Sequence, residues 1–267
     1  MNHHFTKPWT RGTGNSVALL MNSQSPQVAE LMVSHSWAED IDECCQALFG
    51  EESRLQLHTR VWFCAFSVYQ PGDQKGDVGP GIQEQLHLDP FGRVIELLRQ
   101  ATGDQALQPR LGMAVVHTSR AEVYDRLWCV YEIACATRAT LPILVCCSDA
   151  YFDNSQGHVL EVLQVRTRRA QCFSATDRRT INRKVRQSGG YKRLDSEIFN
   201  FRMSMLCNLA RERGKLQLFR KEFDEAEKEL RKMNAMTLKR RRRKLLVSVC
   251  FVLIGLAALA SINFRAL

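Results

Sequence analysis

The chain has 267 residues, of which 45% are hydrophobic and 24% are charged. These values are near the averages of globular proteins, so they exclude a disordered, collagen-like or entirely membrane-embedded chain. The length allows one ordinary domain of about 150–200 residues with additional segments. The net charge of +9 is local, because residues 239–244 contribute +6 and residues 166–193 contribute +9, which leaves −6 for the rest of the chain.

The ten cysteines favour a reducing compartment. Two pairs are adjacent, at positions 44–45 and 146–147, and most of the others lie within apolar runs. The sequence has no Cys-x-x-Cys motif and no set of cysteines and histidines at zinc spacing. We therefore expect small buried thiols, no disulfide framework and no bound metal. The first sixteen residues lack the apolar segment of a secretory signal.

Residues 245–264 form an uncharged apolar segment directly after the six basic residues 239–244. A helix of that length is about 30 Å long, which matches the hydrocarbon thickness of a bilayer. We expect a C-terminal transmembrane helix that anchors the chain by its tail, with the N-terminal domain in the cytosol because basic residues favour that side. Which membrane receives the helix, and whether the natural chain continues beyond it, stay open.

Two alternatives apply to this region. The apolar segment could be a buried core helix, and the basic run could be a nuclear or nucleic-acid-binding signal rather than a lipid contact. Nucleic-acid binding is not expected elsewhere, because Arg166–Arg193 contains only two aromatic residues, Phe173 and Tyr191.

The chain from residue 29 alternates between strand-like and helix-like patterns, after a polar segment, 1–28, that we expect to be a flexible arm. Four apolar runs are typical of buried strands: Leu31–Ser34, Val61–Val68, Leu111–His117 and Leu141–Cys147. Three segments between them have helical character: Glu39–Phe49, Phe91–Gln100 and Asp125–Ala136.

This alternation predicts an α/β fold, a parallel sheet with helices on both faces. Ligands of such sheets bind outside the carboxyl ends of the strands. Here that edge would collect Ser34–Trp37, the loop after Val68 and His117–Arg120. A binding site at this edge is the default hypothesis.

A heptad-like apolar pattern begins at Leu209 and continues for about three heptads. It predicts an amphipathic helical stalk over residues 195–238, although Gly214 weakens the helix. The stalk could form a coiled-coil dimer, or it could be a single helix that packs on the domain; the pattern leaves both open.

Two segments resemble the Toll/interleukin-1 receptor (TIR) domain family. Val33–Asp40 (VSHSWAED) is similar to the opening of these domains, where the first strand ends in a serine-containing loop followed by an acidic pair. Arg126–Ile133 (RLWCVYEI) is similar to the family's Trp-Cys-x-x-Glu-Leu element, with isoleucine in place of the leucine. The run VWFCAFSVYQ also resembles a TIR-like branch of uncharacterised protist proteins. The resemblance covers about residues 29–190, and the loop after the second strand lacks the family's Arg-Asp-x-x-Pro-Gly turn.

The resemblance implies a five-stranded, flavodoxin-like sheet that signals through self-association. In some branches of the family the domain also cleaves NAD at the nicotinamide–ribose bond, and the catalytic glutamate belongs to the Trp-Cys-x-x-Glu element. Carried over to this chain, that residue is Glu132. NAD would then be a substrate, no cofactor is expected, and the partners would be a second copy or other TIR-like proteins.

The residue chemistry is compatible with this assignment. Trp128 and Glu132 are four residues apart, so they share a helix face. Breaking an N-glycosidic bond builds positive charge on the ribose, and a carboxylate in a site drier than water would stabilise that charge. The candidate ligand-binding residues are Ser34, His35, Ser36, Trp37 and Trp128. Trp37 could stack on a base, and the serine hydroxyls could bind phosphate or ribose.

Each of these residues also has a structural interpretation. Trp128 could be a core side chain, Glu132 a solvated helical carboxylate, and His35 a hydrogen-bonded structural histidine. Two functions remain: a membrane-anchored signalling module, or an NAD-cleaving enzyme that uses Glu132. A pocket at the strand ends with Glu132 facing into it would favour the enzyme, and a filled edge or a solvent-facing Glu132 would favour the module.

Overall fold

The structure, a computed structural model, describes residues 2–50, 55–56, 58–71, 78–101, 112–155, 166–233 and 235–236. The chain divides into two compact units. The first comprises Met1–Gln156 and Val165–Leu206, and the second comprises Gly157–Gln164 and Cys207–Leu267. The candidate site lies wholly in the first unit.

Among the residues that the structure describes, the first unit contains a parallel sheet of four strands: β1 (Leu31–Ser34), β2 (Val61–Phe63), β3 (Gly112–His117) and β4 (Ile143–Cys147). Their order across the sheet is β2-β1-β3-β4. The chain therefore builds outward from β1 to β2 and then crosses to the other side of β1 to form β3. The carboxyl ends of β1 and β3 flank this reversal, which is where open α/β sheets bind ligands.

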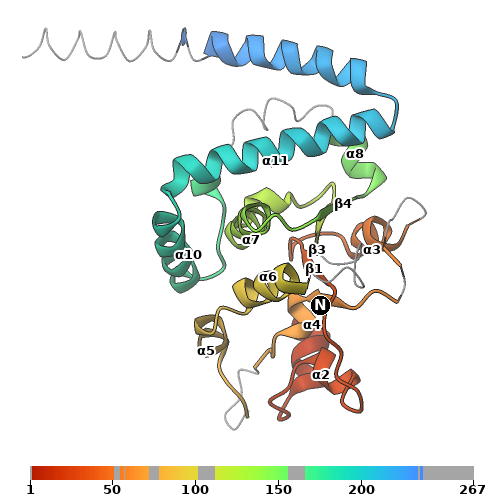
Figure 1. The fold of residues 1–267 in the computed structure, drawn as a ribbon, viewed down its shortest axis with the longest axis vertical. Helices are drawn as coiled ribbons and strands as arrows, with labels where there is room; N and C mark the ends of the chain where they lie inside the picture. Colours follow the sequence, from red (N-terminus) through yellow and green to blue (C-terminus); the bar gives the residue numbers. More distant parts are fainter. Residues whose placement is uncertain are drawn as a thin grey trace, which may run out of the picture. The chain divides into compact units, whose positions relative to one another are not determined.

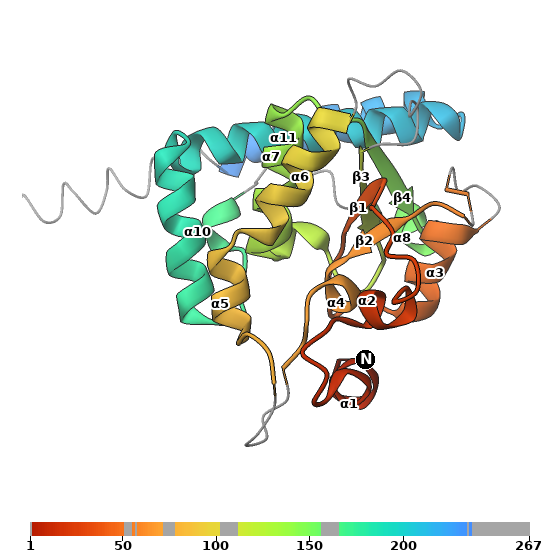
Figure 2. The ribbon, with the colours of Figure 1, turned by 60° about the horizontal axis from the view of Figure 1, so that its bottom comes forward.

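Helices cover both faces of the sheet (Figure 1). Their bounds are α1 Lys7–Thr10, α2 Val17–Met21, α3 Ile41–Phe49, α4 Cys64–Ser67, α5 Ile82–His87, α6 Pro90–Ala101, α7 Leu127–Arg138, α8 Asp149–Ser155, α10 Ala175–Gln187 and α11 Gly190–Glu212. Shorter helical turns are η1 Asn2–Thr6, η3 Val123–Asp125 and η5 Thr167–Arg169. Figure 2 shows α3 and α7 on opposite sides of the strands. This α/β architecture, with a flavodoxin-like strand order, confirms the fold class predicted from the alternating pattern.

Alternate residues of the central strands enter two separate cores, because successive side chains point to opposite faces. One core lies under α6, α7, α10 and α11, and its members include Met32, Met113, Val115, Leu98, Ile133, Ile181 and Ile198. The other lies under α3, and its members include Leu31, Val33, Ala114, Val116, Ala47 and Leu48. Burial on both faces is why these strands have continuous apolar runs.

Two expectations are corrected in the first part of the chain. The run 61–68 is not one strand: β2 ends at Phe63, and Cys64–Ser67 form the helical turn α4, so the Val68 N–H bonds to the Cys64 carbonyl. The segment 1–28 is not simply an arm. Residues 2–21 contain η1, α1 and α2, and the buried Thr10 hydroxyl bonds to the Gln70 carbonyl beside α4.

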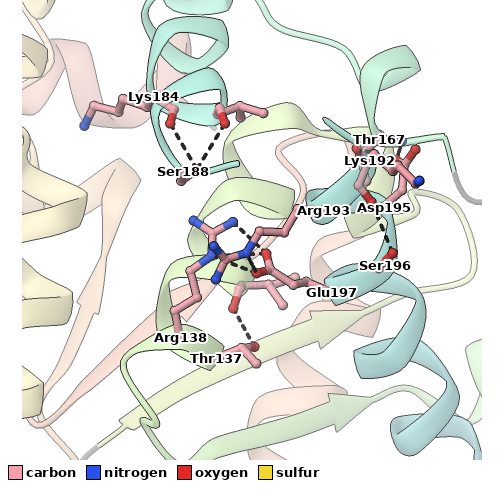
Figure 3. A network of polar contacts seen from close by, with 12 residues as sticks. Thr137, Arg138, Thr167, Lys184, Ser188, Lys192, Arg193, Asp195, Ser196 and Glu197 are labelled. Carbon is pink, nitrogen blue, oxygen red and sulfur yellow. Dashed lines mark hydrogen bonds and ion pairs between the residues drawn. The ribbon is translucent and has the colours of Figure 1, made fainter. Parts of the chain in front are cut away.

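The helix α11 contributes to the domain core through Leu194 and Ile198, so the compact unit continues to Leu206 rather than ending at 190. Polar contacts join α11 to α7 (Figure 3). Glu197 accepts hydrogen bonds from the guanidinium of Arg138, with a shortest distance of 2.6 Å, and from Nε of Arg193 at 2.8 Å. Part of the predicted stalk is therefore a domain helix.

In the second unit, helical backbone covers residues 216–233. Gly214 separates it from α11 with a φ of +67°, a conformation that favours glycine. Among the residues that the structure describes, no helix is long and apolar enough to cross a bilayer. The basic run 239–244 and the predicted span 245–264 lie outside the described residues, so the membrane helix stays a prediction.

Candidate functional site

The last residue of β1 and the three residues that follow it are four of the predicted ligand-binding residues. Ser34, His35 and Ser36 are buried, with 1%, 5% and 2% of their surface exposed, whereas Trp37 is 50% exposed. The Ser36 carbonyl accepts a hydrogen bond from the Glu39 N–H at 3.2 Å, which closes a turn before α3 begins. The Asp40 carboxylate then caps α3 by accepting hydrogen bonds from two backbone N–H groups.

The predicted catalytic residue meets this edge from the other side. Helix α7 packs on β1 and β3, and its Glu132 accepts a hydrogen bond from the Ser34 hydroxyl, with 2.7 Å between Oγ and Oε2. Glu132 is only 4% exposed. Two residues 98 positions apart, each taken from one of the two TIR-like segments, are thus in direct contact.

The environment of Glu132 favours its neutral form. Burial raises the pKa of Glu132 to about 7, although the Ser34 hydrogen bond and the charge of His35 act to lower it. Strongly shifted pKa values cluster at functional sites, so this shift supports Glu132 as a candidate site residue. Glu132 is therefore not the solvated helical carboxylate that the sequence left open.

Trp128 lies in a different environment from the other predicted residues. Its ring stacks on Phe91 of α6, with centroids 4.8 Å apart and 28° between the planes, and it packs against the main core. The Trp128 side chain therefore contacts α6 and the core. This placement favours the core interpretation of Trp128 over the ligand-binding one.

The end of β3 is filled by side chains. His117 is fully buried between Tyr124 and Tyr151, with ring centroids 5.5 and 5.0 Å away, and neither ring nitrogen has a hydrogen-bond partner among the described residues. Burial, and then the charge of Arg202, lowers the pKa of His117 to about 3, so the ring is neutral. Packed rings therefore fill the end of β3, which leaves the end of β1 as the candidate site.

The loops after β3 and β4 are tied to α3 by Glu43. Its carboxylate accepts hydrogen bonds from the Ser119 N–H and hydroxyl and, at 2.9 Å, from the Ser148 hydroxyl. Burial acts to raise the pKa of Glu43, but these donors outweigh it and lower the pKa. Glu43 therefore ties the loops after β3 and β4 to α3.

Sequence reasoning missed two polar partners of His35. Its Nδ1 lies 2.6 Å from Oε1 of Glu39, and its Nε2 lies 3.6 Å from the sulfur of Cys64. The spacing of four residues between His35 and Glu39 was a usable signal. The pairing of β2 with β1, which aligns Phe63 with Val33, also predicts that Cys64 lies near His35. Among the described residues, no group of three or more ligating side chains could hold a metal ion.

No protein-family model, no curated protein and no solved structure matches this chain. The TIR-like interpretation therefore depends on the two sequence segments and on the geometry that they adopt.

Proposed function

We propose that the α/β domain cleaves NAD at the nicotinamide–ribose bond, with Glu132 as the catalytic carboxylate. The observation that supports this function best is the Ser34–Glu132 contact at the carboxyl end of β1, beside the reversal in strand order. The contact joins the two segments that resemble TIR domains, and it places Glu132 against the carboxyl end of β1 rather than in solvent.

The chemistry needs a carboxylate rather than a carboxylic acid. When the glycosidic bond breaks, its electron pair goes to the pyridinium ring, so nicotinamide leaves as a neutral molecule without a proton donor. Positive charge builds on the ribose, and water then adds to give ADP-ribose and a proton. An ionised Glu132 in a site of low dielectric would stabilise that charge. Ser34 would hold the carboxylate in position, and the exposed indole of Trp37 offers a stacking surface for a ring.

The test is nicotinamide release from NAD by the purified full chain in detergent, measured by chromatography at pH 8. We expect Glu132→Gln to lower the rate by about 100-fold or more, the range for loss of one electrostatic contact in a transition state. Glu96→Gln is the matched control, because Glu96 is an exposed carboxylate on α6 that bonds to Arg99. A folded wild-type chain that releases no nicotinamide, or a Glu132→Gln variant with wild-type activity, would contradict the proposal.

The second candidate function is a signalling module that self-associates, and one observation favours it. Ile41 and Phe49 of α3 are 53% and 51% exposed, and Cys45 between them is also exposed. Positions four residues apart align on one helix face, so these side chains form an apolar stripe. A second copy with the same stripe is the proposed partner. The predicted membrane anchor would raise the effective concentration of such copies.

A further inference from the structure

A thiol, an imidazole and a carboxylate form a chain of contacts next to β1. Cys64 is the first residue of α4, directly after β2, and its sulfur lies 3.6 Å from Nε2 of His35. The other ring nitrogen of His35 lies 2.6 Å from a carboxylate oxygen of Glu39, and both of these side chains are at least 94% buried. This is the order of nucleophile, base and orienting group that activates cysteines in proteins.

The hydrogen bond to Glu39 determines which ring nitrogen of His35 carries a proton and which one faces the Cys64 sulfur. A carboxylate only accepts hydrogen bonds, so Nδ1 of His35 carries a proton and donates it to Glu39, which leaves Nε2 directed at Cys64. Trp37 adds a second donor, because its indole N–H lies 3.3 Å from the same sulfur. When both ring nitrogens of His35 carry a proton, its Nε2–H and the Trp37 indole N–H both point at the sulfur.

The electrostatics of His35 agree with this geometry. Burial acts to lower the pKa of His35, but the contacts with Cys64 and Glu39 outweigh it and raise the pKa to about 10. The imidazole is therefore protonated at neutral pH and lies beside the Cys64 sulfur as a possible proton donor. Glu132 is also close enough for the charge of His35 to affect its pKa.

A neighbouring cysteine shows the opposite chemistry. Cys129 of α7 is 6% exposed, and its thiol donates a hydrogen bond to the His35 carbonyl at 3.2 Å. Burial raises the pKa of the Cys129 thiol well above its ordinary range, so this thiol stays protonated and inert. Cys64 is only partly buried, and its sulfur accepts a hydrogen bond from the Trp37 indole N–H.

We propose that Cys64 is the nucleophile of a Cys64–His35–Glu39 triad and is a site of covalent modification by small electrophiles, with peroxides as the natural class. The thiolate sulfur attacks one oxygen of hydrogen peroxide, the S–O bond forms and the O–O bond breaks. The hydroxide that leaves takes the proton from Nε2 of His35 and becomes water. The sulfur is oxidised to a sulfenic acid, the peroxide is reduced, and His35 becomes neutral. This site does not depend on NAD cleavage.

The test uses the folded full chain and measures the alkylation rate of each cysteine with iodoacetamide at pH 7 by peptide mass spectrometry. Cys45 is the internal control, because it is exposed on α3. We expect Cys64 to react at least ten times faster than Cys45 although it is less exposed. We also expect hydrogen peroxide to give a sulfenic acid at Cys64 that dimedone traps. A Cys64 that reacts no faster than Cys45, or one that dimedone does not label, would overturn the proposal.

Variants separate activation by the triad from simple access to the sulfur. Glu39→Gln and His35→Gln should each lower the alkylation rate of Cys64 to that of Cys45 or below it. Both positions are buried, so Trp37→Phe supplies a second variant: it lies at the surface and removes only the indole N–H donor. We expect Trp37→Phe to slow Cys64 several-fold and to leave Cys45 unchanged. A faster Cys64 in Trp37→Phe would show that the indole only shields the sulfur, and this result would contradict the triad.

Discussion

The pKa of Glu132 affects both the stability of the fold and the proposed chemistry. Its pKa of about 7 in the folded protein lies above its ordinary value of 4.5. The folded chain therefore holds a proton that the unfolded chain releases between pH 4.5 and 7, so the stability contributed by this group falls as pH rises through that window. Over this window the contribution of Glu132 to the free energy of unfolding falls by about 3 kcal/mol.

Replacing Glu132 by glutamine should remove this dependence. Glutamine can still accept the hydrogen bond from Ser34, and it stays neutral at every pH. We expect Glu132→Gln to be about as stable as the wild type at pH 4.5 and more stable by a few kcal/mol at pH 8. Urea unfolding at pH 4.5 and pH 8 measures the stability of each protein. The difference between variant and wild type cancels the contributions of the other titrating groups. An equal difference between the two proteins at both pH values would show that Glu132 does not titrate in this window.

Individual residues differ in how far the sequence predicts them. Ser34 and Glu132 were both identified from short motifs, although nothing in their spacing shows that they touch. Glu39 and Cys64 were missed for a physical reason. A cysteine in an apolar run has the pattern of a packed hydrophobe, and its chemistry depends on a histidine that reaches it only through strand pairing.

At the scale of elements, the contact between α7 and α11 is the clearest polar tie. The Glu197 carboxylate is 18% exposed and binds Arg138, whose side chain is 22% exposed. Burial acts to raise the pKa of Glu197, but the hydrogen bonds from Arg138 and Arg193 outweigh it and lower the pKa. Because α11 contributes core residues, this pair helps to hold the helix on the sheet layer.

Glu197→Gln should lower the free energy of unfolding by about 1–2 kcal/mol, because it weakens charge-assisted hydrogen bonds between partly buried groups. The matched control is Glu227→Gln, which breaks the exposed pair of Glu227 and Arg231 within one helix. That change should cost at most about 0.5 kcal/mol. Chemical denaturation compares the two variants, and equal effects would mean that the tie between α7 and α11 adds no stability.

Element boundaries were predictable where the apolar pattern had one explanation. The segments for β1, α3, α6, β3, α7 and β4 were found within a few residues of their observed ends. The run 61–68 was misassigned because a short, fully apolar segment suits a buried strand and a buried helical turn equally well. The polar composition of residues 1–28 concealed short helices whose buried groups are mainly threonine and serine side chains.

At the scale of the whole molecule, the exposed stripe on α3 predicts self-association. The full chain in detergent should form a dimer whose population rises with concentration, and Ile41→Ser with Phe49→Ser should make it monomeric. Both side chains are about half exposed, so the fold should be retained. Leu97→Ser is the matched control, because Leu97 is a similarly exposed apolar residue on α6. Sedimentation velocity measures the effect. A dimer that survives the double substitution would locate the contact elsewhere, for example in the predicted stalk.

The whole-molecule organisation was partly predictable. The alternating pattern gave the α/β class, but it placed the end of the domain near residue 190, whereas the core includes Leu194 and Ile198 of α11. The arginine-rich composition before these residues hid their apolar face. The membrane anchor over 245–264 and the coiled-coil alternative remain predictions from the sequence.

The most direct measurement of the central claim is the pH dependence of kcat/KM for nicotinamide release by the full chain. This ratio reports ionisation in the free protein. If Glu132 acts as a carboxylate with a pKa of about 7, kcat/KM should rise roughly tenfold per pH unit below pH 7 and level off above it. His35 stays protonated over this range, so it should add no second limb. A profile that is flat from pH 5 to 9, or one that falls as pH rises through 7, would contradict a catalytic role for the buried Glu132 carboxylate.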